Sequence, residues 1–162
     1  ERLLLVIEAL NVQIADADAE LDALAQEDPD CRRLMSVPGV GPVTSIRFVA
    51  ALDDRARFPN AHAVQAFLGL TPGERSSSER QQRTGITKAG PAPVRRALVQ
   101  AAWNFRRLRP ADPISQWANQ VEHRRGKFVA TVAVARKLAG VLFALWRDGS
   151  TYNAEHAQRL PA

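Results

Sequence analysis

The chain has 162 residues, the usual size of one domain or of one domain with an appendage. Apolar residues make up 46% of it and charged residues 24%, a composition typical of a folded globular protein. The single cysteine, Cys31, excludes an internal disulfide framework and a Cys-x-x-Cys zinc pair. We therefore expect a reducing, cytoplasmic setting.

The charges are unevenly distributed along the chain. Residues 1–54 contain 11 acidic and 4 basic side chains, a net charge of −7, whereas residues 55–162 contain 18 basic and 6 acidic ones, a net charge of +12. A basic segment behind an acidic arm indicates a polyanionic partner for the basic segment. A basic surface that faces only solvent fits the same counts, so charge alone leaves both interpretations open.

The first segment has a heptad pattern. Its apolar residues recur at alternating spacings of four and three, at Leu3, Ile7, Leu10, Ile14, Ala17, Leu21 and Leu24. Isoleucine at position a with leucine at position d favours a two-stranded coiled coil. We therefore expect residues 1–28 to form a coiled-coil-like helix ahead of a second unit, residues 29–162. The alternative is an amphipathic helix packed on its own domain.

A glycine-rich turn follows the first helix. Residues 28–30 end that helix, and Asp30 is the expected N-cap of the next one. The Pro-Gly-Val-Gly sequence at 38–41 then joins two apolar segments, the pattern of a helix-hairpin-helix motif with its second helix at 42–52. Backbone N–H groups at the start of that helix suit a phosphate oxygen, and a plain turn between packed helices is the alternative. The candidate DNA-contacting residues of this turn are Gly39, Val40 and Gly41.

The remaining sequence is dominated by helical patterns. Apolar spacing predicts helices near 60–68, after Gly90, around 114–123 and over 128–147. The last is the most apolar, but Arg136 and Lys137 interrupt it, which favours a buried helix over a membrane span. We expect the polar residues 73–90 to form a long loop that is either functional or disordered, with a short hairpin as the one candidate β structure. The predicted fold class is all-α.

The polar segment carries the candidate chemistry. Three adjacent serines, Ser76, Ser77 and Ser78, lie among four basic residues, Arg75, Arg80, Arg83 and Lys88. Positive groups around a hydroxyl suit attack on a phosphodiester, because they stabilise charge on the phosphoryl oxygens in the transition state. The alternative is a polar loop that only holds a nucleic-acid backbone. A second basic cluster at 122–127 fits either nucleic-acid binding or a solvated helix end, and the three histidines show no metal-ligand spacing.

Several motifs in a fixed order resemble one known family. They are Leu34-Met35-Ser36-Val37-Pro38-Gly39-Val40-Gly41-Pro42, Phe67-Leu68-Gly69-Leu70-Thr71-Pro72, the three serines, Gly85-Ile86-Thr87-Lys88-Ala89-Gly90 and Val94-Arg95-Arg96-Ala97-Leu98-Val99-Gln100-Ala101-Ala102-Trp103. This order is similar to that in the C-terminal domain of the insertion-sequence 110/116/902 transposases, the bridge-RNA-guided serine recombinases. The resemblance covers residues from about 33 to 110.

The resemblance implies a set of site residues. The family's serine precedes a glycine and aligns with Ser77; because Ser78 stands at the glycine position, Ser76 and Ser78 are kept as alternates. Lys88, Arg95 and Arg96 match family positions near DNA or guide RNA, and a structural role is their alternative.

The resemblance also implies partners. DNA and a guide RNA are expected, and the full-length bacterial protein is expected to be a homo-oligomer without membrane association. An N-terminal RuvC-type domain, absent from this chain, would hold a divalent metal, expected to be Mg²⁺, and residues 1–28 would be the remnant of the linker to it. No cofactor is expected in this chain.

We therefore predict a transposase fragment that binds DNA and supplies a serine nucleophile for strand cleavage and joining. By itself, without the metal-binding domain, it is expected to bind nucleic acid but not to recombine DNA. Two alternatives are a non-catalytic helix-hairpin-helix DNA-binding module and a coiled-coil interaction protein.

Overall fold

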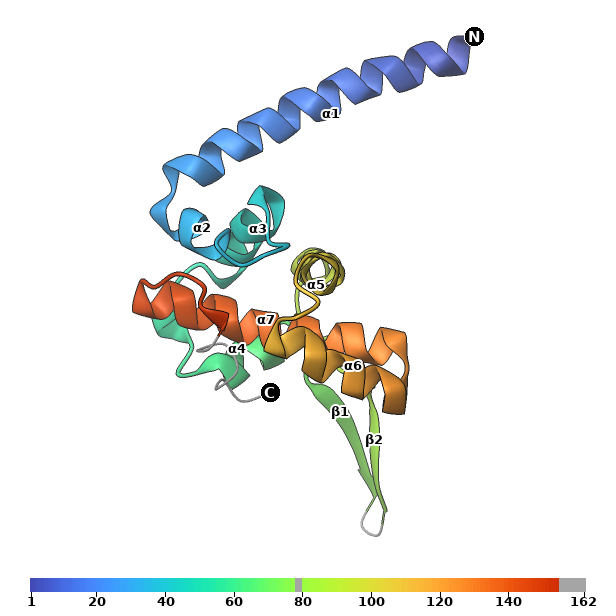
Figure 1. Ribbon diagram of the computed structural model, residues 1–162, viewed down its shortest axis with the longest axis vertical. Helices are drawn as coiled ribbons and strands as arrows, with labels where there is room; N and C mark the ends of the chain where they lie inside the picture. The colour runs from blue at the N-terminus through green and yellow to red at the C-terminus, as the bar shows by residue number, and fades with distance from the viewer. Residues whose placement is uncertain (78–79, 155–162) are drawn as a thin grey trace.

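Helices make up most of the structure, with one long helix and one β-hairpin extending in different directions from the helical body (Figure 1). The computed structural model describes residues 1–77 and 80–154, and of residues 74–77 and 80–84 the backbone alone. The all-α prediction is confirmed. In chain order the elements are α1 (Arg2–Glu27), α2 (Pro29–Leu34), α3 (Pro42–Leu52), the 3-10 helix η1 (Arg55–Arg57), α4 (Ala61–Phe67), β1 (Pro72–Ser77), β2 (Arg80–Ile86), α5 (Ala92–Leu108), α6 (Pro113–Arg125) and α7 (Lys127–Asp148).

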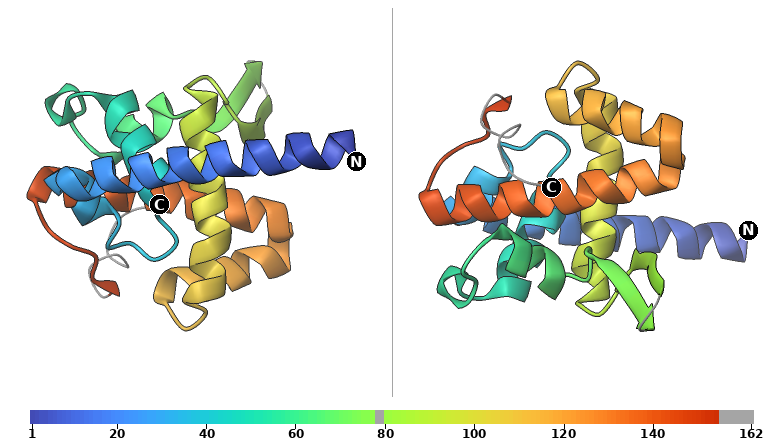
Figure 2. Two further views of the ribbon diagram at one scale, coloured as in Figure 1. Left: turned by 90° about the horizontal axis from the view of Figure 1, so that it is seen from above. Right: turned by 90° about the horizontal axis from the view of Figure 1, so that it is seen from below.

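The core is built around α7. Helices α4, α5 and α6 pack against it, and α5 crosses it (Figure 2). Its length and mean hydropathy of 1.8 over 18 residues would suffice for a membrane span, but 61% of that window is buried inside the domain. Leu138, Leu142 and Phe143 are at most 1% exposed. The prediction of a buried helix here is confirmed, because the apolar residues are covered by the other helices.

Asp28, rather than Asp30, caps α2. The Asp28 carboxylate accepts hydrogen bonds from the N–H groups of Asp30, at 2.7 Å, and Cys31, at 3.3 Å. Pro29 fills the first helical position, where its missing N–H costs nothing, so the cap falls one residue before it. The prediction that Asp30 is the cap was wrong. Asp30 instead accepts a hydrogen bond of 2.8 Å from Nε1 of Trp146 and thereby ties α2 to α7.

Helix α1 contacts the body only at its C-terminal end, through α2 and α3 (Figure 1). Ala25 is its one buried residue. The apolar side chains of the heptad pattern are exposed, with Leu3 at 78% and Ile14 at 58%. The alternative that this helix packs along its own domain was therefore wrong, whereas its pairing as a coiled coil stays a prediction.

Residues 72–77 and 80–86 form the two strands of an antiparallel hairpin rather than an irregular loop. The paired residues are Pro72 with Ile86, Glu74 with Arg83, Arg75 with Gln82, Ser76 with Gln81 and Ser77 with Arg80. The long-loop prediction was wrong for this stretch, and the short hairpin kept as an alternative is confirmed. The hairpin projects away from the helices (Figure 1), so neither of its faces needs the apolar alternation by which strands are recognised in a sequence.

The segment after α7 turns back onto the helical body. The Tyr152 hydroxyl donates to Oδ2 of Asp112 at 2.8 Å, and the Tyr152 N–H donates to Oγ of Ser36 at 2.9 Å. Asp112 is buried, and its other oxygen accepts from the Ile114 N–H at 2.8 Å, which caps α6. One carboxylate therefore joins the C-terminal segment to the start of α6.

The Tyr152 contact predicts a specific pH dependence of stability. Burial, and then the bond to Asp112, raise the pKa of Tyr152 above its ordinary value of 10. The unfolded chain loses the phenolic proton first, so the stabilisation is complete below pH 10 and declines as the pH rises above it. Tyr152→Phe is expected to cost about 1 kcal/mol at neutral pH and to reduce that decline. Urea denaturation of both proteins at neutral and alkaline pH measures this, and equal declines would contradict it.

Candidate nucleophile site and nucleic-acid interface

The hairpin rises from a tightly packed root. The Lys88 N–H donates to the Gly69 carbonyl at 3.1 Å, and the Thr87 N–H donates to the Thr71 carbonyl at 2.9 Å. Gly69 has a φ of +67°, and a Cβ at Gly90 would lie 1.8 Å from the Phe67 carbonyl oxygen. The backbones that enter and leave the hairpin are therefore in direct contact, which fixes where it leaves the body.

Arg95 holds this root together. Its Nη1 donates to the carbonyl oxygens of Leu68, at 3.2 Å, and Gly90, at 3.0 Å. These bonds join the end of α4 to the start of α5 and give the half-buried Arg95 a structural role. The neighbouring Arg96 and Lys88 are exposed.

The candidate serines lie on the outer part of the hairpin. In the strand register Ser77 is paired with Arg80 and Ser76 with Gln81. Arg75 and Arg83 follow on the same two strands, opposite Gln82 and Glu74. The alternate serine, Ser78, lies outside the described residues. The backbone thus carries two of the three serines and three of the predicted basic residues on an arm that projects from the body (Figure 1).

The predicted glycine turn lies between α2 and α3 and packs on α5. Gly39 has a φ of +82°, and a Cβ there would lie 2.7 Å from the Phe105 nitrogen and 2.8 Å from the Ala101 oxygen. Val40 is buried, and its N–H donates to the Val37 carbonyl at 3.0 Å. Close packing therefore accounts for the glycine at position 39. Within the described residues, the N–H groups of Gly41 and Val43 at the start of α3 donate to no other residue.

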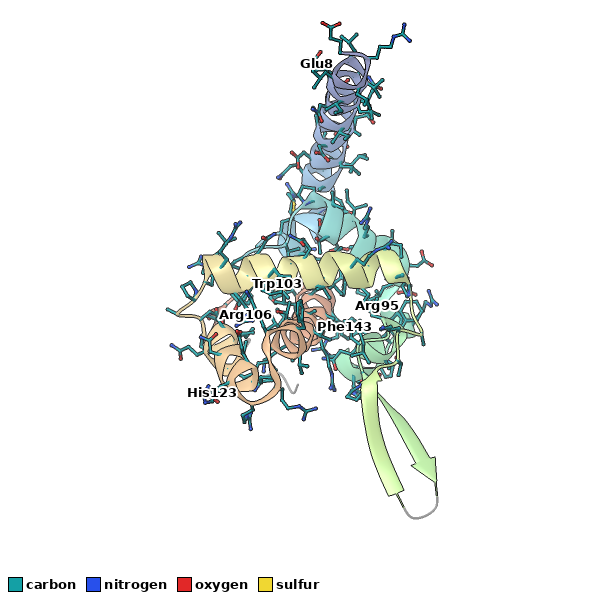
Figure 3. All side chains as sticks on the ribbon, turned by 90° about the vertical axis from the view of Figure 1, so that its right-hand side faces the viewer. Glu8, Arg95, Trp103, Arg106, His123 and Phe143 are labelled. Atoms are coloured by element: carbon teal, nitrogen blue, oxygen red, sulfur yellow. The ribbon has the colours of Figure 1, made fainter. Side chains whose placement is uncertain are left out.

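The two sets of predicted contact residues lie at different places along α5. Gly39 packs against Ala101 and Phe105, whereas Arg95 and Arg96 lie in the first turns of α5, beside the hairpin root. Arg95 and Arg96 precede Ala101 and Phe105 by five to ten residues, which span about 8 to 15 Å of α-helix. Figure 3 shows Arg95 at the hairpin end of α5 and Trp103 farther along it. The structure therefore groups Lys88, Arg95 and Arg96 with the hairpin and separates Gly39, Val40 and Gly41 from them.

A groove of about 870 Å³ lies between the hairpin root and the corner at which α6 meets α7. We call it the corner groove. Its apolar lining comes from Leu70, Ile86, Phe128, Val129 and Val132, and its basic lining from Lys88, Arg124, Arg125 and Arg136. The basic cluster at 122–127 pointed to this corner, but Phe128, which also lines the groove, was not among the predicted site residues. The sequence did contain one signal for Phe128: it is an aromatic residue that directly follows a run of basic residues, at the start of a predicted helix.

Two hydrogen bonds with Gln65 hold Arg136 in place at the corner groove. Its Nε donates to Oε1 of Gln65 at 3.0 Å, and the Gln65 amide donates back to the Arg136 carbonyl at 3.1 Å. Gln65 is only 2% exposed. This buried amide fixes the guanidinium stem at the groove and couples α4 to α7.

The described residues, 1–77 and 80–154, offer no donor set for a metal. Within them, no three His, Cys, Asp or Glu side chains are grouped so that they could hold a metal ion. The resemblance places the divalent metal in another domain rather than in these residues, and we derive no step through a metal.

Comparison with known proteins gives one consistent family. A model described as the Transposase IS116/IS110/IS902 family matches residues 31–116. The chain is 35% identical over 141 residues to the transposase for insertion sequence element IS1111A of Coxiella burnetii, covering 86% of this chain and 39% of that protein. It is 28% identical over 143 residues to the transposase for insertion sequence element IS1328 of Yersinia enterocolitica, covering 87% of this chain and 43% of that protein.

The matches cover most of this chain but less than half of each relative. The chain spans about two fifths of the length of these relatives. The family model covers more than half of this chain and includes the α2–α3 turn, the hairpin and α5. The chain therefore belongs to the IS116/IS110/IS902 family of transposases.

Proposed function

We propose that this chain is the part of a transposase that binds DNA and supplies the serine nucleophile for strand cleavage and joining. The observation that carries the proposal is the hairpin: it bears Ser76 and Ser77 beyond a root with exposed cationic side chains, within the segment that matches the transposase family. A projecting arm can reach a phosphate in duplex DNA, whereas a hydroxyl buried in the helical core cannot.

Ser77 is the proposed nucleophile. Its oxygen forms a bond to a DNA phosphorus while the bond from that phosphorus to a sugar oxygen breaks, and the serine proton passes through a base to the departing sugar oxygen. The resulting phosphoserine ester keeps the energy of the phosphodiester, so a second sugar hydroxyl can reverse the step and join a new strand. Arg80, paired with Ser77 in the register, and Arg75 and Arg83 on the same strands supply positive charge for the transition state.

We propose that another domain completes the site. The curated relatives are more than twice as long as this chain, and the described residues offer no metal-binding cluster. A divalent metal bound in that second domain, expected to be Mg²⁺, would supply positive charge at the reacting phosphate when present. The 162-residue chain alone is therefore expected to bind nucleic acid without recombining it.

Two surfaces are proposed to hold nucleic acid. At the hairpin root, the exposed Lys88 and Arg96 contact phosphates of DNA or of a guide RNA, and Arg95 positions the root. At the α2–α3 turn, the N–H groups of Gly41 and Val43 lie at the start of α3, where the helix dipole favours a phosphate oxygen. This second contact is the helix-hairpin-helix role proposed for the turn.

The phosphate contact at Arg96 is tested by salt dependence. Arg96→Ala is expected to weaken binding of this chain to duplex DNA and to lower the slope of log affinity against log salt by about 1, because one fewer counterion is released. Fluorescence anisotropy at several salt concentrations measures the slope. Arg147→Ala is the matched control, because Arg147 is also exposed but pairs with Asp148 at the far end of α7. Equal slopes for the wild type and Arg96→Ala would contradict the contact.

A second role is proposed for α1. Its exposed apolar stripe, with Leu10 at 56% and Leu24 at 58% exposure, favours pairing with an apolar helix of another copy or of another domain. Such pairing would contribute to a homo-oligomer of the full-length protein.

A further inference from the structure

We infer that the corner groove binds unpaired nucleotides, with a base against Phe128 and the flanking phosphates against Arg124 and Arg125. This inference rests on the proposed nucleic-acid-binding function and adds to it a second class of nucleic-acid site, one that recognises the faces of bases rather than the backbone of a duplex.

Phe128 supplies the surface for the base. Its side chain is 80% exposed, and the adjoining Val129 is 45% exposed. The Phe128 ring lies edge-to-face with Trp103, with centroids 6.5 Å apart, so α5 supports it on one side. The Lys127 ammonium covers the Trp103 ring instead, 4.8 Å from its centroid. Base stacking requires an aromatic ring that is held in place but keeps an exposed face, and Phe128 beside the apolar lining of the groove meets this requirement.

The positive charges that line the corner groove favour an anionic ligand. Lys88, Arg124, Arg125 and Arg136 line the groove, and no acidic residue is among its described lining residues. Glu122, the acid on the same turn of α6, is already paired with Arg106. A ligand that fills the groove must therefore combine a flat apolar part with negative charge. A nucleotide has both, since its base is apolar on its faces and its phosphate carries the charge.

The geometry favours unpaired over paired nucleotides. In a duplex the base faces are stacked on their neighbours, and only phosphates, sugars and groove edges are accessible. Phe128 can stack only on a base whose face is free, as in a single strand or an RNA loop. The volume of about 870 Å³ lies in the range of pockets that enclose small organic ligands, which leaves room for a nucleotide.

The groove adjoins the root of the hairpin that carries the candidate serines. Ile86 closes β2, Lys88 belongs to the hairpin root, and both line the groove. In Figure 3, α6, which carries His123, and the hairpin lie on either side of α7. A strand held at Phe128 could therefore extend to the root of the hairpin.

The experiment separates base contacts from phosphate contacts. Binding of the 162-residue chain is measured by fluorescence anisotropy to a short thymidine oligonucleotide and to a strand of the same length with abasic sugars, at one salt concentration. Phe128→Ala is expected to weaken binding of the thymidine strand about tenfold. It should leave binding of the abasic strand unchanged, because that strand keeps its phosphates but has nothing to stack.

Three further variants sharpen the result. Phe128→Trp is expected to restore binding of the thymidine strand, because it keeps an aromatic face. Arg124→Ala combined with Arg125→Ala should weaken binding of both strands. Leu108→Ala is the matched control, since Leu108 is 57% exposed at the end of α5 but lies outside the groove. Thermal unfolding verifies that each variant folds, which the exposure of these side chains leads us to expect.

The possible results distinguish the inference from the proposed function. If the wild-type chain binds neither strand nor duplex DNA, both fail. If it binds nucleic acid but Phe128→Ala has the same affinity as the wild type for the thymidine strand, the inference is wrong while the proposed function stands. If Phe128→Ala instead changes only self-association in sedimentation velocity, the groove is a protein interface and the inference is equally overturned.

Discussion

Replacing Ser77 by alanine in the full-length transposase is expected to abolish strand transfer while leaving DNA affinity unchanged. Alanine lacks the oxygen that forms the bond to phosphorus, and no neighbouring group replaces a covalent nucleophile at the same position. Loss of a nucleophile typically lowers turnover by about 10⁴-fold or more. Binding should persist, because the phosphate contacts proposed at Arg96 and Lys88 lie at the hairpin root and not at the serine.

The neighbouring serines provide the controls for this substitution. Ser76→Ala and Ser78→Ala should retain strand transfer, and a covalent protein–DNA adduct trapped from the wild type should map to Ser77 by mass spectrometry. An adduct at Ser76 or Ser78 would identify that serine, rather than Ser77, as the nucleophile. Full activity of all three variants would show that the hairpin supplies no nucleophile, and the chain would then be a non-catalytic DNA-binding module.

Gly90→Ala is expected to have the largest effect on folding. Its Cβ would lie 1.8 Å from the Phe67 oxygen, 2.8 Å from the Phe67 carbonyl carbon and 2.9 Å from that of Leu68. These are backbone atoms, so no change of side-chain rotamer relieves the clash, and the start of α5 must separate from the end of α4. We expect a loss of about 3 kcal/mol or more. In a domain of this size that corresponds to a fall in Tm of roughly 10 °C.

Gly85→Ala is the matched control for Gly90→Ala. It adds the same methyl group five residues earlier, where no atom lies within 4 Å of the new Cβ. Its Tm should stay close to that of the wild type in thermal unfolding followed by circular dichroism. Similar Tm values for Gly90→Ala and Gly85→Ala would mean that the hairpin root is much looser than described above.

The helices could be predicted from the sequence because their apolar residues recur with the helical period. The second helix of the glycine turn was placed at 42–52, and α3 has those bounds. The predicted 128–147 helix is α7 within one residue at each end. Both helices bury one or more faces, and burial is what imposes a regular apolar pattern. The hairpin was left as a secondary alternative because it projects from the helices (Figure 1) and its strands carry no such pattern.

Contacts between distant segments could not be read from the sequence. Arg95 looks like any basic residue on a helix, and only the fold reveals that it joins Leu68 to Gly90. Likewise, Phe128 fits the apolar pattern of a core helix, but it lies at the corner before the core begins, and its ring is exposed. The spacing of apolar residues in the sequence determines which face of its helix a residue occupies. Its function depends on the residues from other segments that the fold places next to it.

The near isolation of α1 has a consequence for assembly. A helix that lacks tertiary contacts is only marginally stable in water, because each residue it orders loses conformational entropy that nothing else offsets. With Ala25 as its one buried residue, this helix must gain its stability from whatever covers its leucines and isoleucines. Twenty-six residues of helix span about 39 Å. If α1 pairs as proposed, it would become rigid only on association, and the distance it sets between the segments it joins would be fixed only in the assembled protein.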